Sequence, residues 1–307
     1  MMDHLSLFWV SPDRNKYLKA IETDFFERIY RAVKKGTLAL PPIPDVVVKL
    51  QRVCNDPHTT IRDVSGVLLD DATLTAAVIR SANSAVFSPR TNRKCLDINM
   101  AVSRLGIKRV LGISTAHAIQ MLKNESSFDV DCNAILKKSA ISSREFASTM
   151  ALLCQKVRSY DESHHWLEVE KALLIGLLAD IGIYSAVKAY QQYTNEGNYL
   201  DFDIASHVFF SLSKETSRFI LESWGFDEDF EEVSINKRVR SSEEEVTYLD
   251  IARMANHLLM FRANDEEIDE HEVEITLAGA EALYELSNLN ESDFRHQLND
   301  IINNCGF

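Results

Sequence analysis

The sequence predicts an all-α protein in which an N-terminal helical bundle packs on a second helical bundle. All six prolines lie at or before Pro89, so the 218 residues that follow lack the punctuation typical of many short strands. Apolar residues recur at helical spacing along most of the chain. Residues 172–187 are almost uniformly apolar and carry one charge, Asp180. A helix that is apolar on nearly all sides belongs inside a bundle, so we expect a central buried helix with a carboxylate within it.

Composition is that of a globular chain with room for about two domains at roughly 100–200 residues each. Hydrophobic residues make up 46% of the 307 residues and charged residues 26%. The five cysteines show no Cys-x-x-Cys spacing, which predicts reduced thiols in a cytoplasmic protein. No signal peptide or membrane anchor is expected, and the apolar run is too short and too interrupted for a membrane span.

Charge is distributed unevenly along the chain. The net charge is −13, yet residues 201–307 hold 8 Lys/Arg against 25 Asp/Glu, and residues 1–200 carry a net charge of +4. The acidic total argues against general affinity for nucleic acid. The N-terminal part is therefore mildly basic, and the C-terminal part is strongly acidic.

Helical spacing in the first third predicts a series of short helices. Residues 14–35 read as one helix that ends at Gly36, and a rigid proline-rich entry follows. Thr60 and Asp63 resemble a capping box, while Asp71 and Asp97 stand where helix N-caps are expected. The predicted helices cover residues 45–53, 60–68, 72–82, 98–105 and 107–121, with a polar loop at 88–95.

The remaining chain predicts longer helices with polar loops between them. Loops are expected at residues 124–131 and 161–165. Asp227 is placed to cap an acidic helix. The other predicted helices cover residues 133–158, 168–190, 213–224, 247–262, 272–287 and 291–304.

Five linked sequence motifs lie within about 70 residues. They are Leu40-Pro41-Pro42-Ile43-Pro44, Asn55-Asp56-Pro57, Asp70-Asp71-Ala72-x-Leu74, Ser81-Ala82-Asn83-Ser84-Ala85-Val86-Phe87 and Ala101-Val102-Ser103-Arg104-Leu105-Gly106. Together they resemble the HDOD (HD-related output domain) family, a relative of the HD phosphohydrolases. With Leu177–Gly182 and Trp224-Gly225-Phe226, the resemblance spans roughly residues 30–260. It implies an N-terminal helix at 1–36, an HDOD N-terminal bundle at 37–125, a degenerate HD-like bundle at 126–262 and a helical extension at 263–307.

HD enzymes bind metal through a His-Asp doublet and further His and Asp residues, and the resemblance implies that this chain has lost all of them except Asp180. The doublet position reads Ala179-Asp180. The other ligand positions fall approximately at Lys138, Ser213, Lys237 and Asn256. One carboxylate is not a site for a divalent ion, so we expect no catalytic residue, no metal and no cofactor. We expect Asp180 to be a structural acceptor held by Lys138, by Asn256 or by backbone donors.

A basic concentration near the polar loop is a candidate interaction surface. Asn83 and Ser84 can bond nearby backbone and hold the loop in one pose. The surface comprises Asn83, Arg90, Arg93, Lys94, Arg104, Lys108 and Arg109. The alternative interpretation is a solvated rim that pairs with the acidic C-terminal half. His164 and His165 are predicted to be exposed and structural, and His117 to be a core histidine.

The resemblance implies a non-catalytic regulatory or interaction module in bacterial signal transduction. Its partner would be an unknown signalling protein, with a sensor or cyclic-dinucleotide pathway as the candidate setting. Neither a membrane nor a nucleic acid is expected as a partner. Two alternatives stay open: a degenerate HD-type metal-dependent phosphohydrolase acting on nucleotides, and nucleic-acid binding through the basic loop.

Overall fold

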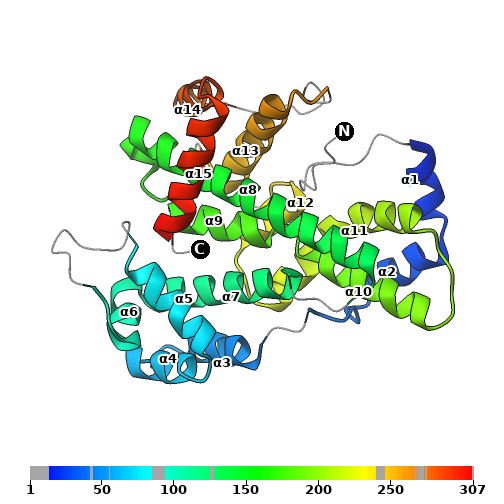
Figure 1. Cartoon of the computed structure of the whole chain (residues 1–307), viewed down its shortest axis with the longest axis horizontal. Coiled ribbons are helices and arrows are strands. Elements are labelled where there is room, and N and C mark those ends of the chain that lie inside the picture. The colour runs from blue at the N-terminus through cyan, green and yellow to red at the C-terminus, as the bar shows by residue number, and fades with distance from the viewer. Residues whose placement is uncertain are drawn as a thin grey trace. The chain divides into compact units, whose positions relative to one another are not determined.

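The structure is a computed structural model that describes residues 14–41, 44–54, 56–84, 94–124, 128–239, 246–266, 268, 273 and 275–305. These residues form fifteen α-helices and one short 3-10 helix, and no strand occurs among them (Figure 1). The predicted all-α fold class is therefore confirmed.

The chain forms two compact units. The first contains the described parts of Met1–Pro41 and Lys123–Asn288, and the second those of Pro42–Leu122 and Leu289–Phe307. The boundary falls within helix α7 (Ile107–Asn124), whose last two residues belong to the first unit. The domain limits that the sequence resemblance implies at residues 36, 125 and 262 stay predictions.

The second unit is built from short helices whose caps are visible in the sequence. The Thr60–Asp63 capping box is present, Asp71 and Asp97 cap the helices that follow them, and Gly106 ends a helix with φ +81°. Its apolar core includes Val47, Leu50, Val64, Leu68 and Val102. The helices are α3 (Asp45–Cys54), α4 (Ile61–Leu68), α5 (Ala72–Ala82), α6 (Ile98–Leu105), most of α7, and α15 (Glu291–Cys305).

The first unit is organised around one long helix. This helix, α8, packs extensively on α9, and also on α10, α13 and α14. Gly176 permits the close approach of α9, because a Cβ atom there would lie 2.5 Å from the Cα atom of Ala147 on α8. The helices are α1 (Arg14–Ile21), α2 (Asp24–Lys34), α8 (Val130–Tyr160), α9 (Val169–Leu178), α10 (Gly182–Asn195), α11 (Phe202–Ser223), α12 (Glu228–Ile235), α13 (Tyr248–Ala263) and α14 (Leu277–Ser287).

Two predicted helices are each divided in two. Residues 14–35 form α1 and α2, because the Thr23 side chain accepts a hydrogen bond from the Phe26 amide at 3.1 Å and starts a new helix. The predicted central helix is also wrong as a single element. The Gly182 amide donates to Ser217 Oγ at 2.9 Å instead of continuing the helical ladder, so Asp180 lies in a turn between α9 and α10.

Other helix starts differ from the predictions as well. Helix α11 begins at Phe202 rather than near residue 213, because Asp201 accepts from the Asp203 and Ile204 amides.

Residues 169–195 are long and apolar enough to cross a membrane by length and composition alone. Their most apolar window is 89% buried inside the protein, so the protein core accounts for the apolar character of α9 and α10.

Candidate functional site

Asp180 is a buried carboxylate whose two oxygens are bound by side chains. The residue is 3% exposed. Lys123 Nζ donates to Asp180 Oδ1 at 2.7 Å, and Ser139 Oγ donates to Oδ2 at 2.5 Å. Ser143 Oγ lies 2.7 Å from Oδ1 and also 2.6 Å from the Ser139 carbonyl oxygen, so its single proton serves one of these acceptors at a time. The carboxylate is therefore satisfied entirely by protein groups.

Lys123 supplies the positive charge of this site. Its side chain is fully buried, and its Nζ also donates to Ser143 Oγ at 3.1 Å. Sequence reasoning missed Lys123, although a signal was present. Helical spacing places residue 123 on the same face of α7 as the buried residues Ala116 and Ile119. A lysine on an apolar helix face requires a buried acidic partner, and Asp180 is that partner.

The prediction that Lys138 or Asn256 holds Asp180 is wrong. Lys138 is exposed on α8, and the contacts come from Ser139 and Ser143 instead. Residues four apart share a helix face, whereas Lys138 is rotated about 100° from Ser139. Asn256 is buried on α13, but its amide nitrogen lies 3.3 Å from Met260 Sδ within the same helix.

Two further substituted positions lie near the turn without binding Asp180. Ala179 is buried and ends α9 directly before Asp180. Ser213 is buried on α11, where its hydroxyl donates to the Phe210 carbonyl at 3.1 Å. The Ser213 backbone packs closely on Gly182, because a Cβ atom there would lie 2.5 Å from the Ser213 carbonyl oxygen. Helices α8, α9, α10 and α11 thus converge at the turn.

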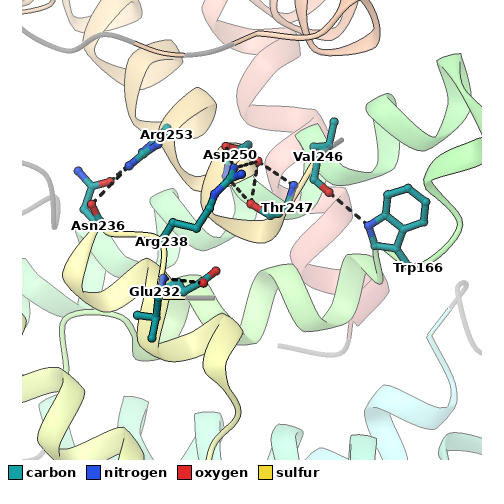
Figure 2. A network of polar contacts seen from close by, with 9 residues as sticks. Trp166, Glu232, Asn236, Arg238, Val246, Thr247, Asp250 and Arg253 are labelled. Carbon is teal, nitrogen blue, oxygen red and sulfur yellow. Dashed lines mark hydrogen bonds and ion pairs between the residues drawn. The ribbon is translucent and has the colours of Figure 1, made fainter. Parts of the chain in front are cut away.

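Lys237 lies elsewhere in the first unit, after α12, and is exposed. Its neighbours form a polar network that fastens α12 to α13 (Figure 2). Arg253 Nε donates to Asn236 Oδ1 at 3.0 Å, and Arg238 Nη2 lies 3.1 Å from both carboxylate oxygens of Asp250. Asn236 adopts a positive φ of 51°, which ends α12 and turns the following residues towards this network. These residues pair with one another rather than with a cation.

The same network also holds the start of α13. Asp250 Oδ2 accepts from the Thr247 amide at 2.8 Å and from its hydroxyl at 2.7 Å, which forms a capping box. Trp166 Nε1 donates to the Val246 carbonyl at 3.2 Å, and Figure 2 shows this indole beside the start of the helix. The buried Glu232 accepts from the Val239 amide at 2.8 Å. This part of the unit is tied together by structural hydrogen bonds.

The residues around Asp180 do not fit a divalent metal. A metal ion needs several converging oxygen, nitrogen or sulfur ligands. Throughout the described part of the chain, no three His, Cys, Asp or Glu side chains gather in a metal-binding arrangement. Moreover, the Lys123 ammonium already occupies the position beside the Asp180 carboxylate that a bound cation would need. A cation entering there would meet a like charge, so the surroundings of Asp180 disfavour a bound metal ion.

The basic candidate surface is only partly described, because Arg90 and Arg93 lie outside the described residues. Lys94 and Lys108 are exposed, whereas Arg104 and Arg109 are half-buried. Asn83 bonds backbone as expected. Its amide donates to the Cys95 carbonyl at 2.9 Å, and its Oδ1 accepts from the Cys95 amide at 2.7 Å. This pair closes the chain segment that carries the basic loop, while the pose of that loop remains a prediction.

The histidines show one further difference from expectation. His165 is exposed, but His164 is buried at 1% exposure and packs edge-on against Trp166. Its Nε2 lies 3.7 Å from Asp161 Oδ2. The prediction that both histidines are exposed is therefore wrong for His164, because the short 3-10 helix Glu162–His164 turns it inward. His117 is half-buried, and burial lowers its pKa.

Comparison of the chain with known protein families finds a match. The HDOD domain model matches residues 40–238, which is more than half of the chain. A curated protein of Treponema pallidum named as uncharacterized is 30% identical over 69 residues. That match covers 22% of this chain and spans only 13% of the Treponema protein's length.

Solved structures share the fold. One from Shewanella amazonensis, named provisionally as a metal-dependent phosphohydrolase, has a TM-score of 0.67 at 19% identity, covering 95% of this chain and 100% of that one. An HDOD domain protein of unknown function from Geobacter sulfurreducens has a TM-score of 0.50 at 18% identity, covering 92% of this chain and 98% of that one. At these identities the likeness shows the fold alone.

Proposed function

Because this chain belongs to the HDOD family, we propose that it is a non-catalytic regulatory module that acts in bacterial signal transduction through a protein partner. The observation that carries the proposal is the buried Lys123–Asp180 ion pair at 2.7 Å. In place of a cation held by several ligands, the protein itself supplies the charge that neutralises Asp180. The site that performs chemistry in HD enzymes is thereby part of the core.

The chemistry of the donor set supports this proposal. Ser139 and Ser143 are buried hydroxyls that are engaged with Asp180, so neither is presented to a substrate as a nucleophile. The thiols of Cys54 and Cys132 are no better suited, because burial raises the pKa of each to about 11. Thiols with such pKa values are almost fully protonated at neutral pH and are poor nucleophiles. Reduced cysteines also suit the cytoplasm, which we propose as the location.

The second candidate function is a degenerate phosphohydrolase. It is favoured by the fold, which is shared with the Shewanella protein named provisionally for that activity. On this alternative, Asp180 would have to exchange Lys123 for a metal ion. The buried position of Lys123 opposes that exchange, because the ammonium would have to leave the core or lose its proton.

The test is metal content together with hydrolysis. The untagged protein is purified without a metal-affinity step and is analysed for Mn, Fe, Ni and Zn. It is then assayed on nucleotides and cyclic dinucleotides with added Mg²⁺ or Mn²⁺. We expect no stoichiometric metal, no turnover above buffer, and no change in melting temperature on adding EDTA. One equivalent of metal bound through Asp180, or turnover that Asp180→Asn abolishes, would establish the phosphohydrolase instead.

A further inference from the structure

An open groove lies on the second unit between α4 and α6. These two helices pack side by side (Figure 1). Its volume is about 720 Å³. Two of its apolar side chains are notably exposed, Ile61 at 39% and Met100 at 43%. The lining residues are Ile61, Arg62, Cys95, Asn99, Met100, Ser103 and Arg104. The groove therefore combines apolar contact area with positive charge.

The described residues that line the groove carry charge of one sign. They include two arginines and no carboxylate. Two carboxylates that flank the lining residues in sequence are engaged in helix caps: Asp63 accepts from Thr60, and Asp97 accepts from the Met100 amide at 2.9 Å. Arg62 is exposed and forms no ion pair within the described ranges. An anionic group that enters the groove would therefore meet the unneutralised guanidinium charge of Arg62.

Hydrogen bonds to Asn83 and Ala82 hold two of the lining residues, Cys95 and Arg104, in place. Cys95 is 2% exposed, and both of its backbone polar groups bond the Asn83 side chain. Arg104 Nη1 donates to the Ala82 carbonyl at 2.9 Å, which holds this guanidinium at the end of α5. A groove that is shaped before binding loses less conformational entropy when a partner arrives.

We propose that this groove binds an acidic amphipathic segment of a partner protein. Such a segment would place an apolar side chain between Ile61 and Met100, and its carboxylates would face Arg62 and Arg104. This inference rests on the proposed function and names the surface through which the module acts. Charge complementarity favours an acidic partner, because residues 42–122 carry 10 Lys/Arg against 6 Asp/Glu in a chain of net charge −13.

The mixed lining favours a peptide over a nucleic acid. Phosphate-backbone binding uses many Lys and Arg side chains in a positive groove, usually with aromatic platforms for the bases. The described lining offers two arginines and aliphatic or thioether side chains, and no aromatic residue occurs among these described residues. Exposed methionine suits an adaptable apolar peptide contact, because its side chain is flexible and polarisable.

The experiment selects a partner by its chemistry. A phage library of random 12-residue peptides is selected on the whole purified chain, with the Arg62→Glu/Met100→Ser variant as the counter-target. We expect the enriched peptides to combine Asp or Glu with an aliphatic or aromatic residue. A synthetic copy, measured by fluorescence polarisation, should lose about tenfold or more in affinity for Arg62→Glu and several-fold for Met100→Ser.

Matched controls separate the groove from general charge. Arg52→Glu makes the same charge change on the exposed side of α3, and Leu69→Ser removes an exposed apolar side chain outside the groove. Each should change the affinity less than about twofold. Equal losses in the controls, or enriched peptides without acidic residues, would overturn the proposal. A dimer that dissociates on Arg62→Glu would also overturn it, because a second copy would then be the occupant.

The two proposals fail in different ways. If the groove is wrong but the regulatory function is right, the selected peptides bind the groove variants and the wild type equally, and the protein remains free of metal and turnover. If the regulatory function is wrong, metal-dependent hydrolysis appears in the assay of the wild-type chain, whatever the peptides do.

Discussion

Lys123 Nζ and Asp180 Oδ1 lie 2.7 Å apart, and the two side chains are 0% and 4% exposed. Lys123 stands at the C-terminal end of α7, and Asp180 stands in the turn between α9 and α10. An ion pair enclosed in this way leaves neither charge accessible to water. Each charge is stabilised by the other, so the two residues contribute jointly to the stability of the first unit.

Removing one partner of this pair should be costly. We expect Lys123→Met or Asp180→Asn to lower the free energy of unfolding by about 3–5 kcal/mol, because each strands the opposite charge in the core. The double variant should cost much less than the two single costs combined. Urea unfolding of the four proteins gives the coupling energy directly.

A surface pair provides the control for that cycle. Lys49 and Asp70 lie 3.5 Å apart and are 58% and 61% exposed, so Lys49→Met should change the free energy of unfolding by less than about 1 kcal/mol. Additive losses at Lys123 and Asp180 would mean that the two charges are not coupled, which contradicts the proposed site.

Close helix packing makes a second prediction, at Gly176. A Cβ atom at this position would lie 2.5 Å from Ala147 Cα and 2.8 Å from Ala147 Cβ, so α8 and α9 would have to separate. We expect Gly176→Ala to cost about 1–3 kcal/mol in thermal unfolding. Gly66→Ala is the matched control, because a Cβ atom there would meet nothing within 4 Å and Gly66 is an exposed residue of α4. That change should be neutral or stabilise by up to about 1 kcal/mol.

Sequence patterns predicted those features that depend on neighbouring residues. The capping box at Thr60 and the caps at Asp71 and Asp97 are local hydrogen bonds, and all three are confirmed. The partners of Asp180 were not predicted correctly, because they come from segments up to 57 residues away. Periodicity could have placed Lys123 on an apolar face, but its choice of partner depends on how the helices pack.

The break between α9 and α10 could not be predicted for a related reason. Residues 172–187 have an almost uniformly apolar pattern, and the interruptions at Asp180 and Gly182 do not by themselves define a helix end. The helix stops because Ser217, on α11, accepts the Gly182 amide. An element that ends through a tertiary hydrogen bond leaves little trace in the local sequence.

Asn83 makes a third prediction, because it pairs with the Cys95 backbone through two hydrogen bonds of 2.9 and 2.7 Å. Leucine can replace neither bond, so Asn83→Leu should lower the free energy of unfolding by about 1–3 kcal/mol. Asn99→Leu on the exposed surface of α6 is the control and should stay within about 0.5 kcal/mol. Chemical denaturation measures both changes, and equal stability of Asn83→Leu and the wild type would refute the structural role.

The last prediction concerns the pH dependence of stability at His117. Burial is the largest cause that lowers its pKa below the ordinary value of 6.5; nearby Arg80 lowers it further, and Asp71 opposes the shift. Its Nε2 atom is buried without a hydrogen-bond partner among the described residues. Protonation of the ring would therefore place a new N–H group and a charge where the fold offers no acceptor.

The direction of the effect follows from proton linkage. Because the pKa of His117 is lower in the folded chain, the unfolded chain binds more protons as the pH falls below about 6.5. The contribution of neutral His117 is fully present above that pH and is lost as the pH falls towards the folded-state pKa. His117→Gln keeps a polar side chain that does not titrate, so it should reduce the fall in melting temperature between pH 7 and pH 5. His58→Gln, at an exposed position of the same unit, is the matched control. A wild-type pH profile that His117→Gln leaves unchanged would show that this ring accepts a proton in the fold without cost.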